Sequence, residues 1–480
     1  MQKIILLVTL MSVHGAKTLF VPMPMNPSHY KSMLPLMLAL SAKGHEVNVW
    51  FTTTENETLH HEKIGIRNFV LKLPSDGWLQ RVAAKNDTDM VKIIWNFKHS
   101  GYIGTIFPNF MGAEALRYTM DQLSSDVDQL LSENWDLIVV DSMFTPFNIL
   151  FLNQNGTTKY PVVLFSTSIS VASDRRNRLL PTNPILHVPL YTVSYNLYSF
   201  FDRITQVIAY LAVAKDSMFY LHYEWRSMGE PAPTNPTTLA LSEGECPEIK
   251  NKSLPKDLLD LVEDPKSKGT VLAAFGHLVT WNGVPMDSIE AIYNAFSKLT
   301  DYRFIWQYNG PELPPQKNIF FSKWIPQPAI LNHPKTKVFM SHSGMKSAQE
   351  CICSEVTMLS FPVFADQFFH GSLICNDAKA GRLVHKLEFT EESLKETLVD
   401  LLENDTYSRN MKRLKSFITY KQQPPLDIFL HFVEFILRNP GSFKTLTQIK
   451  GKKLDPFSYF SLDSCAVFFV IIVVISAIIK

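Results

Sequence analysis

Short apolar runs alternate with helical patterns in the first part of the chain. The run over 17–22 (KTLFVP) is typical of a buried strand, and the helical pattern over 33–42 ends at Gly44, a residue that favours helix ends. The run over 46–51 predicts a second strand, and 135–141 predicts a further buried strand with aspartates near its two ends. The chain therefore begins with a strand–helix–strand unit, in which functional groups gather at the carboxyl ends of the strands.

The same alternation returns in the second half. Residues 269–276 (GTVLAAFG) predict a buried strand that ends at glycine, 289–299 predict a helix, and 302–306 predict the next strand. Repeated units of this length indicate a second parallel, doubly wound sheet. Residues 231–255, between the two regions, are rich in proline and polar residues, which is typical of a linker.

The most informative stretch covers residues 324–367. Its apolar run 338–340 leads directly into the turn 341–344 (SHSG), and a helical pattern begins at Met345. This order of strand, glycine turn and helix presents backbone N–H groups and the positive end of the helix dipole to an anion. A second apolar run, 358–364, is followed by Ala-Asp-Gln, which supplies two hydrogen-bonding side chains.

Composition narrows the class of protein. Of the 480 residues, 46% are hydrophobic and 19% charged, which suits two or three packed domains rather than disorder. The net charge of +1 argues against a nucleic-acid partner, since such proteins carry a basic face. The five cysteines are too scattered for a disulfide scaffold, and Cys351 and Cys353 are expected to be packing residues of a helix.

Both ends of the chain carry apolar segments. Residues 1–16 combine Lys3, an apolar run and small residues, which predicts a secretory signal peptide; an uncleaved first strand is the alternative. Residues 464–479 contain no charge and would span roughly 24 Å as a helix, which predicts a single-pass transmembrane anchor rather than a buried core helix. Glycosylation sequons that fit a luminal protein occur at Asn56, Asn86, Asn155, Asn251 and Asn404.

Two residues of the first half are candidates for catalysis. His29 stands at the turn after the first strand, where an imidazole can act as a general base near neutral pH. Asp141 ends the strand 135–141 and is either a helix N-cap or a partner of a functional group. Residues 59–131 are aromatic with little charge, which fits either ordinary core or a lipophilic pocket; the residues concerned include Phe97, Tyr102, Phe107, Phe110, Met111 and Tyr118.

The stretch 324–367 closely resembles the donor-binding signature of the UDP-glycosyltransferase family, in particular its membrane-anchored, UDP-glucuronosyltransferase-like members. The matching pieces, in order, are WIPQ, HPK, S-H-x-G, Glu350 and FADQ. The resemblance extends over nearly the whole chain. His29, followed by Gly-His-Glu-Val at 44–47, matches the family's catalytic histidine, and Asp141 matches the aspartate that orients it.

The resemblance implies a GT-B fold, an α/β architecture of two doubly wound Rossmann-like domains that face a cleft, followed by the transmembrane helix. Residues 17–245 would form the acceptor-binding domain and 246–450 the domain that binds the UDP-sugar. The helix predicted near 424–435 resembles the family's helix that returns toward the first domain.

The resemblance also implies a set of donor-binding residues. In that set, Trp324 would stack on uracil and Gln327 would hydrogen-bond it, and Glu350 would accept the ribose hydroxyls. His342 and the backbone around Gly344 would hold the diphosphate, with Gly276 and His277 near it, and Lys346 would add a cation near the phosphates. Asp366 and Gln367 would bind the sugar, and Ser347 is a further donor-binding candidate. Oxygen and nitrogen groups of these kinds suit those partners.

Several positions depart from the family pattern. The family has asparagine where Lys346 stands, Gly-Val-Pro at 355–357, where this chain has Glu-Val-Thr, and serine where His277 stands. The family's strands on either side of the linker are not recognisable in 231–255. These departures leave two functions open: a transferase, or a catalytically weak member that binds lipophilic ligands or partner transferases.

The resemblance implies inverting transfer of glucose or glucuronate from a UDP-sugar to a hydroxyl of a small lipophilic acceptor. No metal or other cofactor is expected, because Asp87–Asp89 (DTD) is followed by no suitable strand, overlaps a glycosylation sequon and is interpreted as a surface turn. The protein is expected to be a single-pass membrane glycoprotein with its body in the endoplasmic reticulum lumen. A homo- or hetero-oligomer is left open.

Overall fold

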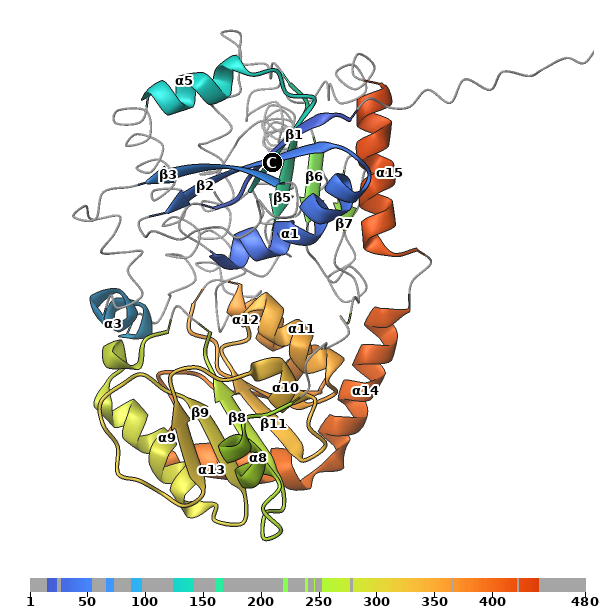
Figure 1. The fold of residues 1–480 in the computed structure, drawn as a ribbon. Helices are drawn as coiled ribbons and strands as arrows, with labels where there is room; N and C mark the ends of the chain where they lie inside the picture. The colour runs from blue at the N-terminus through green and yellow to red at the C-terminus, as the bar shows by residue number, and fades with distance from the viewer. Residues whose placement is uncertain are drawn as a thin grey trace, which may run out of the picture.

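The computed structural model contains two parallel α/β domains, one above the other in Figure 1. It describes residues 15–23, 27–53, 66–72, 88–96, 124–141, 160–166, 219–222, 238–240, 246, 253–276, 279–364, 366–420 and 423–439. The α/β class and the two doubly wound sheets expected from the sequence are confirmed.

The N-terminal domain is built on a seven-stranded sheet of order β3-β2-β1-β4-β5-β6-β7, in which all neighbours are parallel. Its order reverses between β1 and β4, and ligands of such sheets bind at the carboxyl ends of the strands beside this point. The elements are β1 (Lys17–Val21), α1 (Pro27–Ala42), β2 (Glu46–Thr53), β3 (Ile66–Lys72), α3 (Thr88–Asn96), α5 (Ser124–Ser132), β4 (Leu137–Asp141), β5 (Val162–Ser166), β6 (Phe219–His222) and β7 (Thr238–Ala240).

The C-terminal domain is built on a six-stranded parallel sheet of order β10-β9-β8-β11-β12-β13, whose order reverses between β8 and β11. Its strands are β8 (Thr270–Ala274), β9 (Arg303–Gln307), β10 (Ile319–Ser322), β11 (Thr336–Ser341), β12 (Thr357–Ser360) and β13 (Gly381–Leu383). Its helices are α8 (Lys256–Val262), the 3₁₀ turn η3 (Trp281–Gly283), α9 (Met286–Lys298), α10 (Gln327–Leu331), α11 (Met345–Cys353), α12 (Gln367–Ser372), the π-helix η4 (Leu373–Asp377), α13 (Glu391–Glu403) and α14 (Asp405–Thr419).

Strand β8 shows why the strands of this domain appear as continuous apolar runs. Val271 and Ala273 pack into one hydrophobic cluster, whereas Leu272 and Ala274 pack into another on the opposite face. Both faces of the sheet are therefore buried, as is usual for parallel sheets.

The last described helix, α15 (Pro425–Arg438), leaves the C-terminal domain and packs on the N-terminal one (Figure 1). Its Phe429, Val433 and Ile436 belong to the same buried cluster as Met33 and Met37 of α1. The expected return of a C-terminal helix to the first domain is confirmed, so residues 246–450 contribute to both domains.

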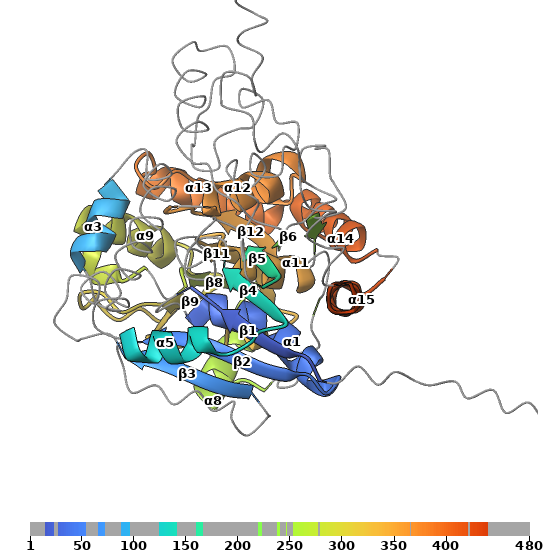
Figure 2. The same cartoon turned by 90° about the horizontal axis from the view of Figure 1, so that it is seen from above.

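Helix α3 belongs to the N-terminal half of the chain but packs on the C-terminal domain, which the sequence did not predict. Its Val91 and Trp95 are buried in a hydrophobic cluster of the C-terminal domain, although the helix lies between β3 and β4 in the chain. Figures 1 and 2 show α3 beside the C-terminal domain, on the side opposite to α15. The interpretation of 87–89 as a surface turn was wrong for its last two residues, because Thr88 and Asp89 begin α3.

Two strands were not predicted from the sequence, and one of them lies in the stretch 231–255, where no strand was recognisable. Strands β6 and β7 extend the N-terminal sheet beyond β5, and β7 lies within the stretch 231–255 that was interpreted as a linker. They have four and three residues respectively, too short for a hydrophobic period to be recognised.

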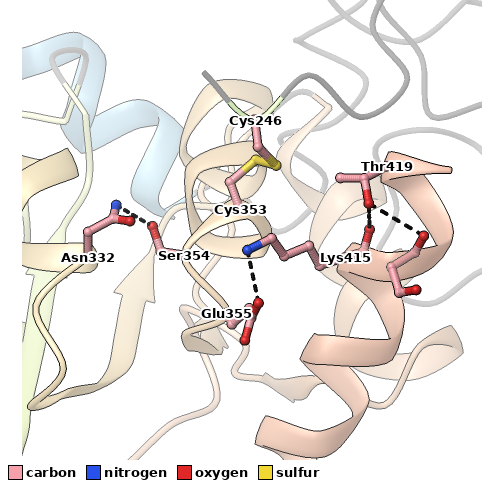
Figure 3. The surroundings of a disulfide bond; sticks show 8 residues. Cys246, Asn332, Cys353, Ser354, Glu355, Lys415 and Thr419 are labelled. Carbon is pink, nitrogen blue, oxygen red and sulfur yellow. Dashed lines mark hydrogen bonds and ion pairs between the residues drawn. A yellow bond between two sulfur atoms is a disulfide. The ribbon is translucent and has the colours of Figure 1, made fainter. Parts of the chain in front are cut away.

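The interpretation of Cys353 as a packing residue was also wrong. Cys353 forms a disulfide with Cys246 across 107 residues of sequence, at the end of α11 (Figure 3). Cys351 is a free, buried cysteine, as expected. The disulfide ties the segment that joins the two domains to a helix of the predicted donor site.

Some predictions fall outside the described residues. These include residues 1–14, the aromatic residues of 97–118, His277, and the apolar segment 464–479. Within the part of the chain that the structure describes, no helix has the length and apolar character needed to cross a membrane.

Candidate active site

The catalytic candidates of the N-terminal domain meet at the point where its strand order reverses. His29 lies in the first turn of α1, after β1, and Asp141 is the last residue of β4. Nδ1 of His29 lies 2.7 Å from Oδ2 of Asp141, whose side chain is fully buried, whereas that of His29 is 13% exposed. A carboxylate that accepts a hydrogen bond from Nδ1–H favours the tautomer with its lone pair on Nε2, the form of imidazole that can remove a proton.

The predicted diphosphate turn lies at the equivalent point of the C-terminal sheet, between β11 and α11. Ser343 has a left-handed backbone with φ of 63°, which costs a non-glycine residue about 1–3 kcal/mol. Its Oγ is 2.7 Å from Oγ of Ser360 at the end of β12, and its N–H donates to Oγ of Ser341 (3.1 Å). These contacts hold the strained turn, after which Gly344 caps α11.

The ring of His342 is enclosed by two glycines. A Cβ atom on Gly344 would lie 2.6 Å from Nε2 of His342, and one on Gly276 would lie 3.0 Å from the same atom. Gly276 also has φ of 70°, a conformation that favours glycine. The turns after β8 and β11 are thus in contact, and three of the predicted diphosphate residues come together.

The residues predicted to bind the nucleoside form a connected group. Nε2 of Gln327 donates to Oε2 of Glu350 (2.6 Å) and lies 3.4 Å from Oγ of Ser347. Burial raises the pKa of Glu350, while the bond from Gln327 and the charge of Lys346 oppose that effect. Gln327 therefore orients the Glu350 carboxylate, a role that the sequence did not suggest.

Trp324 precedes this group and is one of the most exposed large side chains of the described structure. Its side chain is 70% exposed, and the helix α10 begins three residues later. An indole ring left open to solvent next to buried polar groups suits the stacking of a flat base.

Lys346 lies in the first turn of α11 and is influenced by a charge of the N-terminal domain. The pKa of Lys346 is lowered to about 8, mainly by burial and then by the positive charge of Lys31, whereas the charge of Glu350 acts in the opposite direction. Lys31 lies in α1, two residues after His29. Lys31 thus acts electrostatically on Lys346, and Figure 1 shows α1 and α11 on the facing sides of the two domains.

Asp366 and Gln367 differ in what they can offer a sugar. The Asp366 side chain is partly exposed at the start of α12. Gln367 is buried, and its Oε1 accepts hydrogen bonds from the backbone N–H groups of Val363 (2.9 Å) and Phe364 (3.1 Å). The amide oxygen of Gln367 therefore stabilises the turn that carries Asp366, which leaves the NH₂ group as the part of that side chain for a ligand.

The far end of α11 is tied to its neighbours (Figure 3). Nδ2 of Asn332 donates to Oγ of Ser354 (2.8 Å), and Lys415 of α14 pairs with Glu355 (2.9 Å). Glu355 has φ of 59°, so the glycine usual in the family at this position is explained by the left-handed backbone. This chain keeps the same turn with a glutamate that an ion pair holds.

Metal ligands do not gather anywhere in the described part of the chain: no group of three or more His, Cys, Asp or Glu side chains is placed to hold an ion. Sequence reasoning did not find Lys31, Ser360 and Lys386, which contact or influence the predicted site residues or the turn that carries them. These residues belong to no recognisable motif, so only the folded structure brings them to the site.

Comparison with solved structures supports the fold, which is one that two-domain glycosyltransferases share. The solved structure of Arabidopsis thaliana UGT89C1 complexed with quercetin aligns with a TM-score of 0.61 at 16% identity, covering 88% of this chain and 100% of that one. The complex of the same protein with UDP aligns with a TM-score of 0.57 and covers 88% of this chain and 100% of that one, again at 16% identity. At this identity the two structures establish the GT-B fold.

The family is established by sequence. A family model described as "UDP-glucoronosyl and UDP-glucosyl transferase" matches residues 184–480, more than half of the chain. UDP-glucuronosyltransferase 1A1 of Mus musculus is 26% identical over 473 residues, covering 92% of this chain and 85% of that protein. UDP-glycosyltransferase UGT4 of Dactylopius coccus is 32% identical over 235 residues, covering 48% and 44%. The chain belongs to the UDP-glycosyltransferase family, and it is an enzyme that transfers sugar from a UDP-sugar.

Proposed function

We propose that the protein transfers glucose or glucuronate, with inversion, from the UDP-sugar to a hydroxyl group of a small lipophilic acceptor. The observation that carries this proposal is the 2.7 Å contact between His29 and Asp141. The pair lies at the carboxyl ends of β1 and β4. Lys31, two residues after His29 in α1, acts electrostatically on Lys346 of the donor domain.

In the proposed reaction, Nε2 of His29 removes the proton of the acceptor hydroxyl. The oxygen then attacks the anomeric carbon from the face opposite to UDP, the bond from that carbon to the phosphate oxygen breaks, and the product is a β-glycoside. Asp141 holds the ring and stabilises the imidazolium that forms. A positioned general base of this kind contributes about 10²- to 10⁴-fold in rate.

On the donor side, the developing charge of UDP is taken up by His342, by the N–H groups at the start of α11, and by Lys346. Oriented donors of this kind act strongly on charge that develops in the transition state. Glu350 accepts the ribose hydroxyls, Trp324 stacks on uracil, and Asp366 binds sugar hydroxyls. Since these groups together neutralise the diphosphate, the proposal needs no metal ion.

The lipophilic acceptor is proposed from the aromatic composition of residues 97–118, which lie outside the described part of the chain. One structure of similar fold is a complex with quercetin. Phenols are therefore the first acceptors to test.

A luminal, membrane-anchored location is proposed from the signal-peptide pattern, the sequons and the apolar segment 464–479. The Cys246–Cys353 disulfide adds support, because structural disulfides persist in oxidising compartments. Loss of apparent mass after treatment of microsomes with an endoglycosidase tests this location. An unshifted protein that is digested by protease added outside intact microsomes would contradict it.

The test of the function is UDP release from UDP-glucose and UDP-glucuronate with a panel of phenols, followed by determination of the anomeric configuration of the product. We expect acceptor-dependent release and a β-glycoside. A product that retains the α configuration would exclude the proposed displacement.

The second candidate is a catalytically weak member that binds lipophilic ligands or partner transferases. It is favoured by one observation: a buried lysine, Lys346, stands where the family has asparagine, and the charge of Lys31 opposes its charged form. Binding of UDP and phenols without any UDP release would support this candidate.

A further inference from the structure

Helix α3 packs into the hydrophobic core of the C-terminal domain. The ring of Trp95 is fully buried, is stacked on that of Phe361 with centroids 5.7 Å apart, and lies 6.3 Å from that of Trp281. Phe361 directly follows β12 and precedes the turn that carries Asp366. A segment of the first half of the chain therefore packs beside the predicted sugar-binding turn.

A buried lysine joins α3 to this turn. Lys386, after β13, is 1% exposed, and its Nζ donates to the carbonyl oxygens of Ile94 and, at 2.7 Å, of Val363. Ile94 lies in the last turn of α3, where carbonyl groups lack partners within the helix and the dipole favours a cation. Burial lowers the pKa of Lys386 to about 7.

Val363 is consequently held at both of its backbone polar groups. Its carbonyl accepts from Lys386, and its N–H donates to Oε1 of Gln367 (2.9 Å). Asp366, the predicted sugar ligand, lies between Val363 and Gln367. The conformation of this short turn thus depends on two side chains, one of which is anchored to α3.

We propose that Lys386 is a positioning residue for the donor sugar, which fixes the Val363–Gln367 turn against α3 so that Asp366 is presented at the correct place. This inference rests on the proposed role of Asp366 in binding the sugar. Burial of an amine costs free energy unless the amine is hydrogen-bonded, and Lys386 meets that condition through the carbonyl oxygens of Ile94 and Val363.

The uracil, ribose and diphosphate groups are assigned to other elements. Trp324 precedes α10, Glu350 lies in α11, and His342 follows β11. A change at Lys386 is therefore expected to weaken recognition of the sugar and to leave recognition of UDP intact. This separation distinguishes positioning from a general loss of structure.

The test compares Lys386→Met with wild type in binding of UDP, binding of UDP-sugar and steady-state transfer. We expect about a ten- to hundredfold loss of kcat/KM for the UDP-sugar, since a small displacement of a positioning group costs rates of this order. UDP affinity should be unchanged, and Lys386→Arg should restore part of the activity. The matched control is Lys395→Met, because Lys395 is on the surface of α13 and pairs only locally with Glu392 among the ion pairs described.

Two results would overturn the inference: wild-type kcat/KM in folded Lys386→Met, or an equal loss of UDP and UDP-sugar affinity. If Lys386→Met does not fold, Lys386→Gln decides by the same ratio of UDP to UDP-sugar affinity, because its neutral, shorter amide keeps a hydrogen-bond donor but does not reach both carbonyl groups as the amine does. A wild-type ratio in Lys386→Gln excludes the positioning role. Failure of the proposed function is seen separately, as absence of transfer by the wild-type protein.

Discussion

The imidazole of His29 and the carboxylate of Asp141 are joined at 2.7 Å although 112 residues separate them in the chain. His29 follows β1 and Asp141 ends β4, and the order of the N-terminal sheet reverses between these two adjacent strands. The pairing of a partly exposed histidine with a fully buried aspartate fixes the orientation of the ring. It places the proposed base in the N-terminal domain, opposite the donor domain.

Asp141→Asn is predicted to reduce transfer by about 10²- to 10⁴-fold, because an amide can bind the ring without stabilising the imidazolium. UDP affinity should be unchanged. The matched control is Asp136→Asn, which lies at the other end of the same strand and accepts from the backbone N–H of Lys17. Comparison of kcat for the two variants checks the prediction, and equal rates would argue against a catalytic role for Asp141.

UDP affinity is predicted to fall as pH rises above about 8. The pKa of Lys346 is lowered to about 8, mainly by burial and then by Lys31. The bound diphosphate favours the charged amine, so binding takes up a proton and weakens when that proton is lost. About one tenth of Lys346 is protonated one unit above its pKa, so this contribution falls by up to about tenfold between pH 7 and 9.

Calorimetric titration with UDP over this pH range checks the prediction, and Lys346→Asn is the matched variant. We expect a flatter pH dependence for the variant, with weaker binding at pH 7. The same slope in both proteins would show that another group is responsible.

Replacement of both Cys246 and Cys353 by serine is predicted to lower the free energy of unfolding by about 2–5 kcal/mol, since the disulfide closes a long loop. The loss of the disulfide should lower the Tm of the variant, and chemical reduction of the wild-type disulfide should lower its Tm by a similar amount. Cys351→Ser, which removes a free buried thiol, is the comparison. A wild-type Tm that is insensitive to reductant would contradict the prediction.

The sequence predicted the elements whose apolar runs are long and continuous. Strands β1, β4, β8 and β11 could be predicted because both faces of each sheet are buried, which makes these strands continuous apolar runs. The turn at 341–344 could be predicted because glycine and polar residues directly follow such a run. Strands β6 and β7 were missed because three or four residues carry no period. The motif residues of the site were predicted through resemblance rather than from spacing.

Contacts between distant segments could not be read from the sequence. The amphipathic pattern of α3 requires a buried face but does not say which domain buries it. The pairing of Cys246 with Cys353 could not be predicted either, because the spacing of cysteines alone does not identify disulfide partners. Lys386 stands in no motif, and its position between Ile94 and Val363 depends on the packing of α3.

The most direct test of the account is single-turnover transfer from the UDP-sugar to a phenol by wild type and His29→Ala, with UDP affinity measured on the same preparations. The account predicts that transfer by the variant falls by about 10²- to 10⁴-fold while UDP affinity is unchanged, because the base and the donor site lie in different domains. Transfer by His29→Ala at the wild-type rate would contradict the central claim that His29 is the catalytic base.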